Sequence, residues 1–110
     1  MQISKLDART RLSIEMALAG DQGSPALIRQ QDEAATQLGM CGAEIDAARA
    51  GRSFDMRCTR ALELALAFQR GDHGEARSRA IQAGIDADAC CEIEHITAAH
   101  PSAAKVTDHD

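Results

Sequence analysis

The sequence predicts an all-α domain of about six helices, and three observations support this prediction. Apolar residues recur at helical spacing in six segments of the 110-residue chain. Preferred capping residues precede several of these segments, and glycine follows most of them. Alanine, the strongest helix former, occurs 22 times, whereas the β-branched and aromatic residues typical of strands are scarce. We therefore expect one helical domain over residues 1–100 and a mobile tail over residues 101–110.

The predicted helices follow one another through short connections. They span residues 5–19, 25–38, 42–50, 56–70, 75–83 and 87–99. Ser4, Ser24, Asp55 and Asp86 are the expected caps, with Asp7 completing a near capping box behind Ser4. Ser24-Pro25 is the sharpest start signal, because serine caps helices and proline favours their first position.

Two corners of the chain share one pattern, in which a glycine and an apolar residue precede the next helix. Gly39-Met40 and Gly84-Ile85 predict left-handed helix ends followed by a hydrophobic contact. Between these corners, residues 61–68 are apolar on almost every side. We therefore expect the helix over 56–70 to be the central and most buried one.

Composition and charge disfavour several classes of partner. The net charge of −5 and the aromatic content of 2% disfavour nucleic acid, which requires basic footprints and stacking platforms. No apolar run reaches the roughly 18–20 residues of a membrane span. The first residues lack the order of a signal peptide. We therefore expect a cytoplasmic protein whose cysteines are mostly reduced.

The four cysteines do not form a recognised redox or zinc motif. No two of them stand in a C-x-x-C pair, and the adjacent Cys90 and Cys91 are too close along the chain for an ordinary disulfide. We expect the side chains of these two cysteines to be packed against neighbouring residues or partly exposed. Cys41 precedes a predicted helix, and a helix start lowers the pKa of a thiol, so Cys41 is the reactive candidate ahead of Cys58.

Metal and cofactor sites are not expected. Glu92 and His95 have the spacing of one half of a di-iron site, but such a site needs a second pair and two further glutamates. We expect the histidines at positions 73, 100 and 109 to be solvated at the surface. No glycine-rich phosphate loop precedes a helix, and no serine stands in a nucleophile elbow.

The order of helices and corners over residues 11–99 resembles the AhpD-like family, which includes alkylhydroperoxidase and carboxymuconolactone decarboxylase. The resemblance rests on an apolar helix leading to Gly23, on the run from Ala34 to Ile45, and on residues 55–68 followed by Gly84-Ile85. It implies a homo-oligomer, commonly a trimer or a hexamer. It also implies a second helix that opens with C-x-x-C-x-x-x-H and a glutamate in the first helix.

All four of these functional positions are substituted here. Aligned on Gly23, the two cysteines fall on Ser24 and Leu27, the histidine on Gln31 and the glutamate on Leu12. Glu15, one turn after Leu12, is a weak substitute. A serine at a helix start, with no base beside it, stays protonated and caps the helix.

Two functions remain open from the sequence. The first is a non-catalytic, homo-oligomeric binding or assembly module that has lost the C-x-x-C site. The alternative is an enzyme. It would be a peroxidase or disulfide reductase that uses an off-motif thiol such as Cys41, or a decarboxylase-type member that uses Glu15, Ser24 and Gln31. A small molecule bound in a pocket between the first, second and fourth helices would favour the enzyme, whereas an empty, alanine-filled interior would favour the non-catalytic module.

Overall fold

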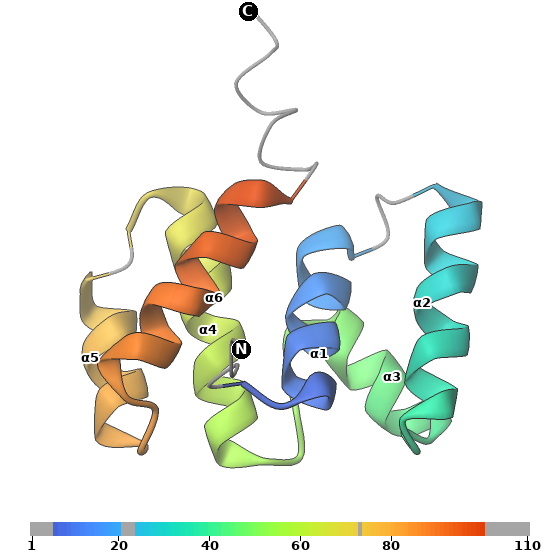
Figure 1. The fold of residues 1–110 in the computed structure, drawn as a ribbon, viewed down its shortest axis with the longest axis horizontal. Coiled ribbons are helices and arrows are strands. Elements are labelled where there is room, and N and C mark those ends of the chain that lie inside the picture. The colour runs from blue at the N-terminus through green and yellow to red at the C-terminus, as the bar shows by residue number, and fades with distance from the viewer. Residues whose placement is uncertain (1–5, 21–23, 73, 101–110) are drawn as a thin grey trace, which may run out of the picture.

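The computed structural model describes residues 6–20, 24–72 and 74–100, and within these ranges the chain forms six helices and no strand. The helices are α1 (Ala8–Ala19), α2 (Pro25–Gln37), α3 (Gly42–Arg49), α4 (Met56–Arg70), α5 (Gly74–Gln82) and α6 (Ala87–Ala99). The predicted all-α fold is therefore confirmed (Figure 1). None of these helices is long and apolar enough to cross a membrane. The predicted tail at 101–110 lies outside the described residues.

The first helix begins later than expected, at Ala8 instead of near Lys5. Asp7 caps it, because its carboxylate accepts a hydrogen bond of 2.8 Å from the backbone N–H of Thr10. Hydrogen bonding from the side chain of Thr10, together with this backbone bond, favours the charged carboxylate and lowers the pKa of Asp7. The expected cap, Ser4, lies outside the described residues. Asp55 occupies the cap position of α4, but its side chain makes no capping hydrogen bond there.

Both predicted corners are confirmed. Gly39 and Gly84 adopt positive φ angles of 88° and 105°, which L-residues with a side chain rarely adopt. The following residues, Met40 and Ile85, each donate the backbone N–H to a carbonyl of the preceding helix at 3.0 Å. Both side chains are buried in the core. Each corner therefore ends one helix and sets the direction of the next.

The helix at the centre of the molecule is α1, which corrects the expectation that α4 is the most buried helix. Seven residues of α1 are buried, and five of them belong to two separate apolar clusters. Ile14 and Leu18 join the larger cluster with α4, α5 and α6, whereas Leu12 and Met16 join the smaller one with α2 and α3. Figure 1 shows α1 between these two groups of helices. A helix buried on several sides carries little amphipathic signal, which explains the wrong expectation.

Helix α2 is the least embedded of the long helices. Only Gln31 and Ala35 are buried among its 13 residues, and its main helix partner is α1. Figure 1 shows α2 at the edge of the molecule, beside α1 and on the far side from α5. This peripheral position leaves a groove along one side of α2.

Candidate functional site

The groove lies between α1, α2 and the end of α6. It has a volume of about 300 Å³. Its walls are formed by Arg11, Glu15, Leu27, Gln31, Ile96, Ala99 and His100. The sequence led us to expect a pocket between the first, second and fourth helices; α6 provides the third wall in place of α4.

Three of the candidate residues from the sequence line this groove, and they come from two different helices. Glu15 comes from α1, and Leu27 and Gln31 come from α2. The other two candidates lie elsewhere. Leu12 is buried in the core, and Ser24 is exposed at the start of α2, where its hydroxyl oxygen accepts a 3.1 Å bond from the backbone N–H of Leu27. Ser24 is therefore a helix cap, as predicted.

Gln31 forms the polar floor of the groove, since only 5% of its surface is exposed. Its amide oxygen accepts a hydrogen bond of 2.9 Å from the guanidinium of Arg49. Arg49 also donates to the carbonyl oxygen of Ile28 at 3.1 Å and to the carboxylate of Asp32 at 2.7 Å. Arg49 of α3 thus ties three points of α2 together and fixes how Gln31 is presented.

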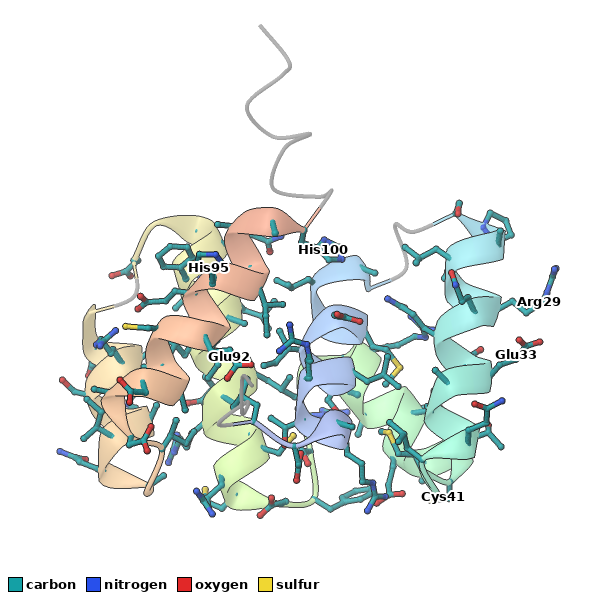
Figure 2. All side chains as sticks on the ribbon, viewed as in Figure 1. Arg29, Glu33, Cys41, Glu92, His95 and His100 are labelled. Atoms are coloured by element: carbon teal, nitrogen blue, oxygen red, sulfur yellow. The ribbon has the colours of Figure 1, made fainter. Side chains whose placement is uncertain are left out.

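An ion pair joins the two helices that flank the mouth of the groove. The guanidinium of Arg11 in α1 donates to the carboxylate of Glu92 in α6 at 2.6 Å. Figure 2 shows Glu92 on the side of α6 that faces α1, whereas His95 lies nearer the C-terminal end of the same helix. In the ranges that the structure describes, no three His, Cys, Asp or Glu residues are grouped so that they could hold a metal ion.

His100 departs from the expected surface position. It is buried at the end of α6 beside α1 (Figure 2), and burial lowers the pKa of its imidazole because the charged form loses hydration. The sequence contained a signal for this burial. His100 stands four residues after Ile96 and seven after Ile93, so it continues the apolar face of α6. His73 and His109 lie outside the described residues.

Lowering the pH from about 7.5 to about 5.5 is expected to destabilise the fold through His100. Because the pKa of the folded state lies below the ordinary value of 6.5, the unfolded chain binds the proton more readily. The stabilising contribution is therefore complete above about pH 6.5 and is lost as the pH falls toward the lowered value. Urea unfolding at the two pH values measures this loss, and His100→Gln should reduce it.

The matched control for this experiment is His95→Gln. His95 is exposed on α6, so this variant makes the same chemical change at a position outside the core. Asp7 and Glu44 have lowered pKa values, but they titrate below their ordinary values of 3.8 and 4.5 and so contribute outside this interval. An equal pH dependence for the wild type and His100→Gln would contradict the prediction.

None of the four cysteines lines the groove. Cys58 and Cys90 are buried in the core, and burial raises the pKa of the Cys90 thiol. Cys41 is exposed at the start of α3, where its backbone N–H donates to the carboxylate of Glu44 at 2.9 Å (Figure 2). Cys91 is exposed on α6. The thiols are thus distributed over two helices, α4 and α6, and the corner before α3.

Arg49 shapes the site, although no pattern in the sequence predicts this role. Its partners Ile28, Gln31 and Asp32 lie 17 to 21 positions earlier in the chain. No local pattern links residues at such separations.

Comparison with protein-family models, curated proteins and solved structures found no match to this chain.

Proposed function

We propose that this chain is a non-catalytic, self-associating module of the cytoplasm with an AhpD-like arrangement of helices. The proposal is carried by the roles of the residues at the substituted family positions. Leu12 packs in the core, the hydroxyl of Ser24 caps α2, and the amide oxygen of Gln31 is bonded to Arg49. Each of these groups serves packing or positioning and supplies neither a thiol nor a base.

The distribution of the thiols supports the same proposal. Peroxide reduction by the family's route needs a thiolate, a second thiol that forms a disulfide with it, and a group that transfers protons. Two of the thiols, Cys58 and Cys90, belong to buried residues of the larger cluster. The two exposed thiols, Cys41 and Cys91, belong to different segments, at the start of α3 and on α6. Neither reaches the groove that holds Glu15 and Gln31.

Exposed apolar side chains support self-association. Phe54, one of two aromatic residues in the chain, is 73% exposed, and the nearby Met56 is 61% exposed. Phe54 also walls a hollow of about 260 Å³ together with Met40 and Cys58. Large apolar groups exposed in this way mark contact surfaces, and a second copy of the chain would cover them symmetrically. A trimer or a hexamer is the assembly that the resemblance implies.

Light scattering tests this proposal. The wild type is expected to have the mass of an oligomer of the 11.7-kDa chain, whereas Phe54→Ser should shift the mass toward that of the monomer. The matched control is Ile81→Ser, which makes a similar apolar-to-polar change at an exposed position of α5. A monomer mass for the wild type across micromolar concentrations would contradict self-association.

One specific observation favours the alternative that the chain is an enzyme. The carboxylate of Glu15 and the imidazole of His100 belong to residues that line the same groove, and such groups can perform acid–base chemistry. We expect the wild type to reduce organic hydroperoxide, with a dithiol as reductant, no faster than a cysteine-free variant. Efficient turnover that Cys41→Ala abolishes would overturn the non-catalytic proposal in favour of a relocated nucleophile.

A further inference from the structure

Two polar side chains of the groove between α1, α2 and α6 carry donor or acceptor groups that have no partner among the described residues. Arginine is only a donor, so Gln31 turns its amide oxygen toward Arg49 and keeps two N–H donors on the other side of the amide. In the described part of the chain these N–H groups have no acceptor, although Gln31 is almost fully buried. A buried donor without a partner is costly, which points to an acceptor supplied by a ligand.

Glu15 is the second such group. It lines the groove from α1, and among the described residues its carboxylate forms neither an ion pair nor a hydrogen bond. Arg11 stands one turn before it on the same helix, but Arg11 is paired with Glu92. The groove thus offers an unpaired carboxylate on one wall and unpaired amide donors on its floor.

Besides Glu15 and Gln31, the polar residues Arg11 and His100 line the groove, and the rest of its wall is apolar. Leu27, Ile96 and Ala99 contribute aliphatic surface from α2 and α6. A cavity of about 300 Å³ lies at the small end of the range for ligand sites. Its occupant is therefore a compact molecule with a short aliphatic body and few polar groups.

We propose that this groove binds a small zwitterion with a branched aliphatic side chain, in the manner of an aliphatic α-amino acid. The ammonium group pairs with the carboxylate of Glu15, and the ligand carboxylate accepts the amide N–H groups of Gln31. The aliphatic body lies against Leu27 and Ile96. All these residues come from one chain, so the site does not depend on self-association.

Titrations followed by NMR chemical shifts test the site with three matched probes. L-Leucine carries all three features, 4-methylpentanoate lacks the ammonium group, and 3-methylbutylamine lacks the carboxylate. We expect leucine at up to about 10 mM to shift the signals of groove residues. Each of the other probes should bind about fivefold more weakly, because each loses one polar contact.

Two variants assign the two polar contacts separately. Glu15→Gln should weaken leucine and 3-methylbutylamine by about fivefold without weakening 4-methylpentanoate. Gln31→Glu keeps an oxygen for Arg49 but removes the N–H donors, so it should weaken leucine and 4-methylpentanoate by about tenfold without weakening the amine. Glu33→Gln is the matched control, because Glu33 is exposed on α2 and is not a groove residue (Figure 2).

Three results would overturn the proposal. The first is that leucine shifts no groove signal in the wild type. The second is that 4-methylpentanoate binds as tightly as leucine, which would remove the role of the ammonium group. The third is that Glu15→Gln binds leucine as tightly as Glu33→Gln, which would show that the carboxylate of Glu15 is not a contact.

Discussion

Replacing Ile14 by alanine is expected to lower the free energy of unfolding by about 3–4 kcal/mol. The Ile14 side chain is completely buried in the larger cluster, where α1 packs against α4 and α6. Truncation removes apolar contacts and leaves a cavity that the surrounding helices fill only in part. Because a domain of this size has a small net stability, this loss is a large fraction of the total. Urea unfolding followed by circular dichroism measures it.

The control is Ile81→Ala, which is the same chemical change at a position of α5 that is 47% exposed. We expect this variant to lose less than about 1 kcal/mol, since much of the side chain is already in water. Similar losses for the two variants would contradict the central position of α1. A small loss for Ile14→Ala alone would show that the larger cluster is less tightly packed than the structure indicates.

Arg49→Ala is expected to lower the free energy of unfolding by about 2–3 kcal/mol and to loosen α2. The side chain of Arg49 is only 13% exposed and makes three hydrogen bonds to α2. Its removal leaves the buried amide oxygen of Gln31 without a donor, which costs more than the loss of a solvated bond. Asp32 is about half exposed, so its share of the effect is screened by water.

Hydrogen exchange separates this local effect from general destabilisation. Since α2 has few buried residues, its amides should lose protection in Arg49→Ala while those of α4 keep most of theirs. Arg79→Ala is the control, because the ion pair of Arg79 with Glu75 is exposed and should contribute less than about 0.5 kcal/mol. Unchanged protection of α2 in Arg49→Ala would contradict the role assigned to Arg49.

Much of the secondary structure was predictable because its signals act over a few residues. The Ser24 cap with Pro25, the Gly39 corner and the Asp86 cap each satisfy backbone groups within one turn, and the structure places all three as expected. The predicted start of α1 was wrong because two residues that can cap a helix lie near one another in the sequence. Asp7 is the one that caps the helix, which begins at Ala8. Local sequence does not decide between two such caps by itself.

The sequence by itself determined the helical class, the number of helices and most of their ends. It also determined that no two of the four cysteines stand in a C-x-x-C pair. Only the tertiary structure decided that α1 lies at the centre, that α6 closes the groove and that Arg49 holds Gln31. The physical reason is the distance along the chain over which each kind of interaction acts. Caps and corners act within about one helical turn, whereas burial and the Arg49 contacts depend on how helices distant in the chain pack together.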